Sequence, residues 1–103
     1  ETVYQFKATV PSCTDFRIGY GATETGPGLS GNRTDSSDVD KAQTVGQPID
    51  FVEVKIVNPE TKHLVKIGET GELHTRGHHV MISYWKEPEK TAKVLQNGWY
   101  NTE

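Results

Sequence analysis

This 103-residue sequence has little of several residue types, and each shortage narrows what the chain can be. Cys13 is the one cysteine, so no disulfide can form within the chain, and the lack of a surrounding motif favours a small apolar filler over a nucleophile. Eleven basic residues stand against 14 acidic ones, which argues against a nucleic-acid or anionic-membrane surface. No apolar run approaches membrane-spanning length, and no signal-peptide pattern appears within these residues.

Apolar residues are also scarce. The hydrophobic fraction is 33%, which is lean for a globular domain, although two Trp, four Tyr and three Phe residues allow a modest core. The length predicts a single domain.

The most informative segment is residues 19–27, GYGATETGP, which places an aromatic ring, a hydroxyl and a carboxylate between glycines. Glycine adopts positive φ and lets a ligand approach the backbone closely. Tyr20 offers a flat face for a base, Thr23 can hydrogen-bond an anionic oxygen, and Glu24 can hold a hard cation such as Mg²⁺. Taken alone, the segment could also be a turn between two strands, with Tyr20 a core aromatic and Glu24 a turn cap.

Further motifs follow in a fixed order. After YGATE at 20–24 come GEL-x-x-RG at 71–77, VM-x-x-YW at 80–85, PE-x-T at 88–91 and GW-x-x-T at 98–102. This order resembles that of the adenylate-forming enzymes, which include acyl-CoA synthetases, peptide-synthetase adenylation domains and firefly luciferase. The resemblance runs from about residue 17 to the last residue.

The resemblance implies a reaction in which the oxygen of a carboxylic acid attacks the α-phosphate of ATP and pyrophosphate leaves. It implies that Tyr20 stacks on adenine, that Thr23 contacts the α-phosphate, and that Glu24 is a ligand of Mg²⁺. Thr23 and Glu24 would then be the catalytic residues. The nucleotide-binding segment that the resemblance implies consists of Gly19, Tyr20, Gly21, Ala22 and Thr23.

The tail of the sequence is most similar to medium- or fatty-acyl-CoA synthetases, because peptide-synthetase domains more often carry Leu than Trp after the tyrosine of the YW pair. Such enzymes join a carboxylic acid to coenzyme A through an acyl-AMP intermediate, so the expected ligands of the parent are ATP, Mg²⁺, CoA and a small acid. The resemblance also implies an intracellular protein, cytoplasmic or mitochondrial.

The family's lysine-bearing phosphate loop, its ribose-binding Asp and its mobile C-terminal domain are not found among these residues. We therefore expect an excised piece of a larger protein, whose remaining domains complete the site. The chain alone is expected to have no ligase activity.

The predicted fold is mainly β. Successive hairpins predict a small distorted antiparallel β-barrel with one short helix. Alternation of apolar and charged residues predicts a strand at 51–57, and residues 87–96 predict the helix, because Pro88 suits a first turn. Glu87, Glu89 and Lys90 would form its solvated face.

The chain is expected to divide into three parts. By the family resemblance, residues 1–25 would be the end of an α/β lobe that carries the nucleotide turn. Residues 26–43 are almost without apolar side chains and predict a polar flexible loop. Residues 44–103 would form the β-barrel subdomain.

Two other interpretations stay open. The chain could be a β-barrel folding unit with no ligand of its own, or a small metal- or peptide-binding module that uses His74 and His78. The adjacent residues His78 and His79 would point to opposite faces of a strand, so surface histidines fit better than a zinc site. Trp85 and Trp99 are expected to pack in the core or at its edge.

Overall fold

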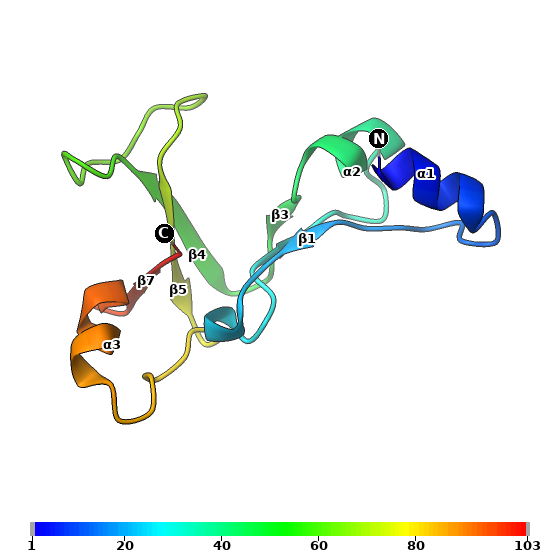
Figure 1. Ribbon diagram of the computed structural model, residues 1–103. Helices are drawn as coiled ribbons and strands as arrows, with labels where there is room; N and C mark the ends of the chain where they lie inside the picture. Colours follow the sequence, from blue (N-terminus) through cyan, green and yellow to red (C-terminus); the bar gives the residue numbers. More distant parts are fainter. Residues whose placement is uncertain (1, 103) are drawn as a thin grey trace.

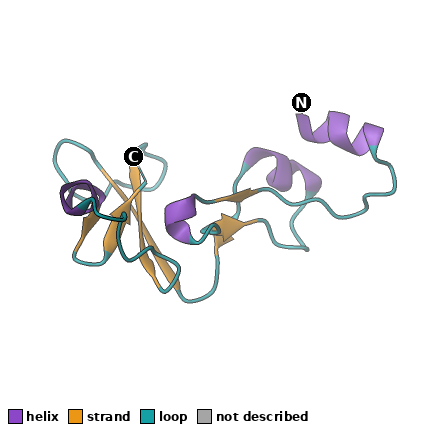
Figure 2. Cartoon of the chain, turned by 60° about the horizontal axis from the view of Figure 1, so that its bottom comes forward, coloured by secondary structure: helices purple, strands orange, loops and turns teal. Residues whose placement is uncertain are grey.

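The computed structural model describes residues 2–102 and has an elongated shape, with extents of 47 × 33 × 24 Å. The chain forms two antiparallel sheets; the first and smaller one lies near the middle of the molecule, the second and larger one lies at one end, and α1 lies at the other end (Figure 1). The first has the strand order β1-β2-β3 and the second the order β4-β5-β7-β6. Helices α1 and α2 accompany the first sheet, and α3 accompanies the second (Figure 2). The elements are α1 (Thr2–Thr9), β1 (Gly19–Tyr20), the 3₁₀ turn η1 (Thr23–Thr25), β2 (Ser30–Gly31), α2 (Asp38–Gln43), β3 (Gln47–Pro48), β4 (Val52–Val57), β5 (Glu72–Gly77), α3 (Pro88–Val94), β6 (Leu95–Gln96) and β7 (Trp99–Asn101).

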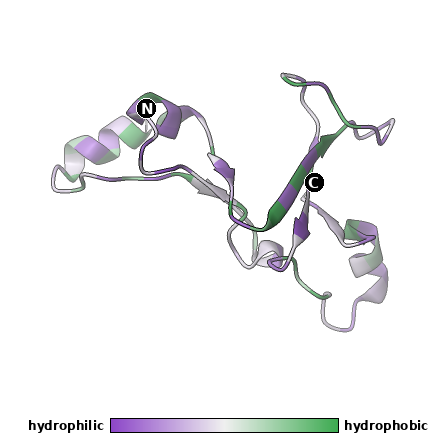
Figure 3. Ribbon diagram, turned by 180° about the vertical axis from the view of Figure 1, so that it is seen from behind, coloured by the Kyte–Doolittle hydropathy of each residue, from purple (hydrophilic) through white to green (hydrophobic). Residues whose placement is uncertain are grey.

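Strand β4 confirms the period-2 prediction and begins one residue later than expected. It pairs with β5 over its whole length, from Val52 opposite Gly77 to Val57 opposite Glu72. Hydrophobic and hydrophilic residues alternate along it (Figure 3). Phe51 lies outside the strand because its φ is +63°, and 92% of its surface is exposed.

The prediction of a β-barrel is wrong for the part of the chain that the structure describes, because both sheets are open. The segment after β4 returns with only one bridge, Val57 to Leu64, instead of a full strand. Residues 80–85 form no strand, since the Met81 amide donates to the carbonyl oxygen of Glu24. The Tyr84 amide donates to the Thr91 hydroxyl, so this stretch of backbone is unavailable to close the second sheet.

The one short helix predicted for the β region is confirmed as α3, and the preceding part of the described chain adds α1 and α2. Helix α2 needs no apolar face. The Ser37 hydroxyl caps its first turn by accepting a hydrogen bond from the Asp40 amide at 3.1 Å. The side chain of Lys41 is only 7% exposed. Its ammonium donates to Asp15 Oδ1 at 3.1 Å and to the Thr34 carbonyl oxygen at 3.2 Å, which joins α2 to the segments before β1 and after β2.

The segment predicted to be a polar loop therefore contains a strand and a helix. Strands β1, β2 and β3 come from the ranges 1–25, 26–43 and 44–103 respectively, and they form one sheet. The division of the chain into three parts of a larger domain stays a prediction.

The buried core is small and divided between the sheets. Leu29 is buried in the first, and Val57 and Tyr100 are buried in the second. Trp99 is half-buried on β7, between β5 and β6, which agrees with the predicted packing in the core or at its edge. The prediction for Trp85 is wrong, since 85% of its surface is exposed on the loop before α3. In residues 2–102 no helix is both long enough and apolar enough to cross a bilayer.

Candidate active site

The glycine-rich segment is the connection of a short hairpin. Strands β1 and β2 pair antiparallel, with Gly19 opposite Gly31 and Tyr20 opposite Ser30. The 3₁₀ turn η1 lies between them, and the Leu29 amide donates to the Tyr20 carbonyl oxygen at 2.9 Å. The segment is therefore a turn between strands, and this does not prevent it from presenting side chains to a ligand. The interpretation of Tyr20 as a core aromatic is wrong, because 38% of its surface is exposed.

Thr25 holds the turn together from inside. It is fully buried, and its hydroxyl accepts a hydrogen bond from the Ala22 amide at 2.8 Å. It lies 2.9 Å from the Ala22 carbonyl oxygen, to which it donates. Gly26 then ends the turn with a φ of +61°, a conformation that glycine adopts without steric cost. No role was predicted for Thr25 from the sequence. A second hydroxyl in the TET triplet was the feature of the sequence that could have indicated a residue bonding within the turn.

This internal hydrogen bonding leaves Tyr20 and Thr23 exposed on the same turn. Gly21 is exposed as well, so its backbone is open to a ligand. A Cβ at position 21 would lie 1.6 Å from the Pro27 carbonyl oxygen, so the hairpin closes only with glycine there.

Glu24 is half-buried and is held by a second part of the chain. Its Oε1 accepts a hydrogen bond from the Tyr84 hydroxyl at 2.7 Å, across 60 residues of sequence. Its carbonyl oxygen accepts from the Met81 amide at 2.8 Å. The hydrogen bond from Tyr84 lowers the pKa of the Glu24 carboxyl and raises the pKa of the Tyr84 hydroxyl. Glu24 is therefore an ionised carboxylate with a fixed direction.

An ionised carboxylate oxygen is the kind of ligand that Mg²⁺ prefers, so Glu24 fits the predicted metal role. Residues 2–102 contain no group of three or more His, Cys, Asp and Glu side chains that could enclose a metal ion. Mg²⁺ in nucleotide sites is commonly held by one or two carboxylates together with phosphate oxygens and water, and a single glutamate is sufficient for that arrangement.

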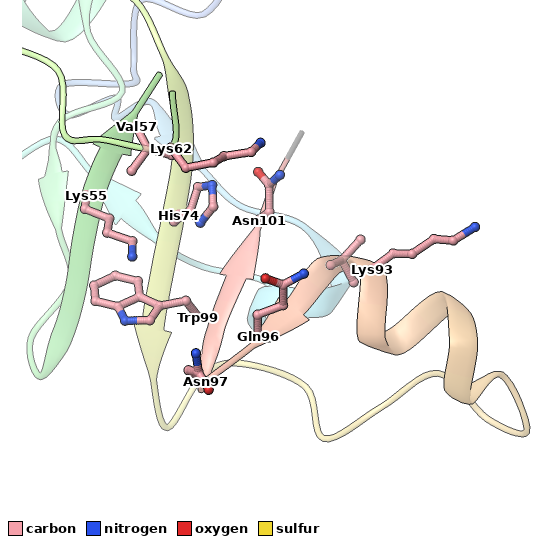
Figure 4. A pocket seen from close by; sticks show the side chains of 10 residues that line it. Lys55, Val57, Lys62, His74, Lys93, Gln96, Asn97, Trp99 and Asn101 are labelled. Carbon is pink, nitrogen blue, oxygen red and sulfur yellow. The ribbon is translucent and has the colours of Figure 1, made fainter. Parts of the chain in front are cut away.

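Among residues 2–102 the three histidines named as an alternative metal site form no metal-holding group, although the rings of His78 and His79 lie edge to face with their centres 6.0 Å apart. The His79 ring contacts the Thr75 hydroxyl at 2.9 Å, and that hydroxyl donates to the Glu53 carbonyl oxygen. His78 is exposed. His74 lines a cavity of about 280 Å³ between the second sheet and the end of α3 (Figure 4).

Three lysines share that cavity with His74 (Figure 4). They are Lys55, Lys62 and Lys93. The Lys55 ammonium lies 4.1 Å from the centre of the Trp99 ring, which orients it by a cation–π contact. The Glu72 carboxylate, 3.6 Å from both the Lys62 ammonium and His74 Nε2, offsets part of this positive charge. The remaining positive charge weakens the case for zinc at His74.

Arg76 is also directed away from the candidate site. Its guanidinium makes two hydrogen bonds to the Glu53 carboxylate across the β4–β5 pair, at 2.9 and 2.7 Å. It also lies 4.7 Å from the centre of the Trp99 ring. In the described residues, these contacts place Arg76 in the β4–β5 scaffold.

Residues 1–85 match the sequence model of a family described as AMP-binding enzyme. The chain is similar to the mitochondrial medium-chain acyl-CoA ligase ACSF2 of Bos taurus, with 41% identity over 86 residues, which cover 82% of this chain and 14% of that protein. It is also similar to the solved structure of the anthranilate CoA ligase AuaEII in complex with anthranoyl-AMP, with a TM-score of 0.82 and 28% identity over 96% of this chain and 18% of that one. For ATP-bound MatB from Rhodopseudomonas palustris, the TM-score is 0.75 and the identity 30%, over 84% of this chain and 17% of that one. The chain spans less than a fifth of the length of each of these proteins.

Proposed function

Because this chain belongs to the AMP-binding enzyme family, we propose that it is the nucleotide-facing part of an ATP-dependent acid–thiol ligase. In this reaction a carboxylate oxygen attacks the α-phosphate of ATP, the bond to the leaving pyrophosphate breaks, and an acyl-AMP forms. The thiol of coenzyme A then attacks the acyl carbonyl carbon, loses its proton and displaces AMP. The names of the relatives support acyl-CoA formation, since both the Bos taurus protein and AuaEII are CoA ligases.

The observation that carries the proposal is the arrangement of three unlike side chains on one turn. Tyr20 and Thr23 are exposed, and the ionised Glu24 is fixed beside them. The Tyr20 ring stacks on the adenine, and the Thr23 hydroxyl donates to an oxygen of the α-phosphate. Exposed backbone at Gly19 and Gly21 allows the nucleotide to approach closely. Together with Tyr20, Thr23 and the half-buried Ala22 between them, these glycines form the nucleotide-binding segment.

Glu24 is the residue that would hold Mg²⁺ against the phosphates. A bound Mg²⁺ would neutralise part of the negative charge that develops on the phosphate oxygens. Thr23 and Glu24 are therefore the catalytic residues of this chain, and both act by electrostatic stabilisation and positioning.

The whole protein takes a small carboxylic acid and CoA in addition to ATP, and it uses residues outside this chain for the remaining phosphate, ribose and thiol contacts. We place it inside the cell, in the cytoplasm or the mitochondrion, since the Bos taurus relative is mitochondrial. The 103-residue chain by itself should show no ligase turnover.

The test compares two glutamates in the full-length protein. Glu24→Gln removes the proposed metal ligand with little change in shape, and Glu89→Gln makes the same change on the exposed face of α3. We expect Glu24→Gln to lower ATP–pyrophosphate exchange by about 100-fold, the effect of removing one preorganised electrostatic group, and Glu89→Gln to leave it unchanged. Unaltered exchange and Mg²⁺ dependence in Glu24→Gln would remove the basis of the proposal.

The alternative of a folding unit without a ligand can be tested with the 103-residue chain. Titration with ATP and Mg²⁺ should shift the amide NMR signals of residues 19–24 and leave those of the 58–62 turn in place. Absence of shifts at 19–24, in a chain whose spectrum shows it to be folded, would favour the folding unit.

A further inference from the structure

The loop between β5 and α3 connects the nucleotide turn to the second sheet. We call residues 78–87 the strap. One end follows β5, where the Val80 amide donates to the Gly77 carbonyl oxygen at 3.2 Å. The other end is held to α3, where the Tyr84 amide donates to the Thr91 hydroxyl at 3.0 Å. The strap is thus anchored at both ends to the second sheet and its helix.

Between these anchors the strap holds Glu24 at two places. The Met81 amide fixes the Glu24 backbone at 2.8 Å, and the Tyr84 hydroxyl fixes Oε1 of its carboxylate at 2.7 Å. The buried Tyr100 of β7 lies near the Tyr84 hydroxyl and adds to the rise in its pKa, after the larger contribution of Glu24. The Glu24 carboxylate is therefore held from the side of the second sheet.

This arrangement decides how the carboxylate can bind a cation. A carboxylate can bind a metal with one oxygen or with both, and Tyr84 occupies a lone pair of Oε1. The hydrogen bond from the Met81 amide to the Glu24 carbonyl oxygen holds the backbone of the turn in place, so the carboxylate cannot move away from Tyr84 by a shift of the turn. Oε2 is then the oxygen presented for coordination, with its direction set by Tyr84.

We propose that Tyr84 is a positioning residue that restricts Glu24 to one-oxygen coordination and thereby favours Mg²⁺ over Ca²⁺. The inference rests on the proposed function, in which Glu24 holds the metal of the nucleotide complex. Mg²⁺ demands near-ideal octahedral geometry, in which a single directed carboxylate oxygen supplies one ligand and phosphate oxygens and water supply the others. Ca²⁺ accepts flexible geometry and readily uses both oxygens of a carboxylate, which the Tyr84 hydroxyl opposes.

The experiment measures ATP binding to the full-length protein by calorimetry at increasing Mg²⁺ or increasing Ca²⁺. Tyr84→Phe deletes the hydroxyl and keeps the ring, and Tyr4→Phe makes the same change on the exposed α1 helix. We expect Tyr84→Phe to raise the Mg²⁺ concentration at half-maximal ATP binding by about 10-fold, the effect of losing a hydrogen bond to a metal ligand. The corresponding Ca²⁺ concentration should stay constant or fall, and Tyr4→Phe should change neither.

A second set of variants keeps the result interpretable if Tyr84→Phe loses stability. Tyr100→Phe leaves the Tyr84 hydroxyl in place and should lower the Mg²⁺ preference less than Tyr84→Phe does. In a Glu24→Gln background, Tyr84→Phe should have no further effect on the metal dependence, because the two residues act as a unit.

Equal changes for Mg²⁺ and Ca²⁺, or a wild-type response in Tyr84→Phe, would overturn the positioning role while leaving the proposed function in place. Failure of the proposed function is a different result, in which ATP binding to the wild-type protein does not depend on a divalent cation. A loss of selectivity confined to Tyr84→Phe and Tyr100→Phe supports the inference.

Discussion

The α-carbon of Gly21 faces the carbonyl oxygen of Pro27 so closely that a Cβ at position 21 would lie 1.6 Å from that oxygen. The obstacle is backbone, which cannot rotate away as a side chain can. Gly21→Ala should therefore force the β1–β2 hairpin open and destabilise the fold by about 1 to 3 kcal/mol, the range for overpacking. Thermal unfolding measures the loss, and ATP affinity should fall with it because the turn carries the proposed nucleotide contacts.

Gly28 provides a matched control in the same hairpin. A Cβ there would meet nothing within 4 Å. Gly28→Ala should leave both stability and ATP affinity near the wild-type values. Similar unfolding temperatures for Gly21→Ala and Gly28→Ala would show that the hairpin adapts easily and that the close approach is unimportant.

The exposed ring of Tyr20 leads to a second prediction. Replacing it with alanine removes a stacking surface, and stacking of a base on an aromatic side chain contributes about 1 to 3 kcal/mol. Tyr20→Ala should weaken ATP binding by about 10-fold, and Tyr20→Phe should retain most of the affinity because the ring remains. The measurement is the equilibrium affinity for ATP. Tyr4→Ala is the control and should leave that affinity unchanged, since Tyr4 is exposed on the α1 helix. Equal affinities of Tyr20→Ala and wild type would exclude the stacking role.

Asn32 joins the strand before the nucleotide turn to the end of α2, and its loss should be costly. It is buried, its Oδ1 accepts from the Ile18 amide at 2.8 Å, and its Nδ2 donates to the Thr44 carbonyl oxygen at 3.1 Å. Asn32→Ala leaves these backbone groups without their partner, and the free energy of unfolding should fall by about 2 kcal/mol. Urea unfolding tests this, and the exposed Gln43→Ala should have almost no effect. A change below about 0.5 kcal/mol in Asn32→Ala would mean that water replaces the side chain.

His79 should make stability depend on pH. Burial and the neighbouring His78 lower the pKa of the His79 ring below its ordinary value of 6.5. The unfolded chain therefore takes up this proton at a higher pH than the folded chain does. The stabilisation from a neutral His79 is fully present above about pH 6.5 and is lost as the pH falls from there toward the folded-state pKa.

The measurement is the free energy of unfolding of wild type and His79→Gln between pH 7.5 and 5. The wild type should lose more stability than the variant over this range, because glutamine does not titrate. His63→Gln, a change at an exposed histidine, should follow the wild-type curve. Parallel curves for wild type and His79→Gln would show that His79 does not contribute to the pH dependence.

Local patterns in the sequence predicted those elements whose stability is local. Asn58 starts the turn after β4 by accepting the Glu60 and Thr61 amides at 2.9 Å each, and Pro88 begins α3 as expected, although β6 takes the last two residues of the predicted helix. These contacts lie within a few residues of sequence. The alternation along β4 predicted a strand, whereas its register is set by the distant strand β5, with Val52 opposite Gly77.

The features that were missed depend on contacts between distant residues. Helix α2 has no apolar face to detect, because a cap at Ser37 and the buried Lys41 hold it in place. The open second sheet likewise follows from the hydrogen bond of Met81 with Glu24, 57 positions apart in the numbering, which no local pattern reveals. The predicted site residues lie together on the turn in the structure. The sequence did not indicate that Tyr84 of the VM-x-x-YW motif would be the hydrogen-bond partner of Glu24.

The anchoring of the strap has a consequence for how such proteins diverge. An insertion or deletion within residues 78–84 would move the Tyr84 hydroxyl relative to Glu24 while leaving every letter of the glycine-rich segment intact. If Tyr84 directs Glu24 as proposed, two homologues with identical YGATE segments would differ in metal preference because of loop length alone. Alignments restricted to that segment would assign them the same ion requirement and would be mistaken.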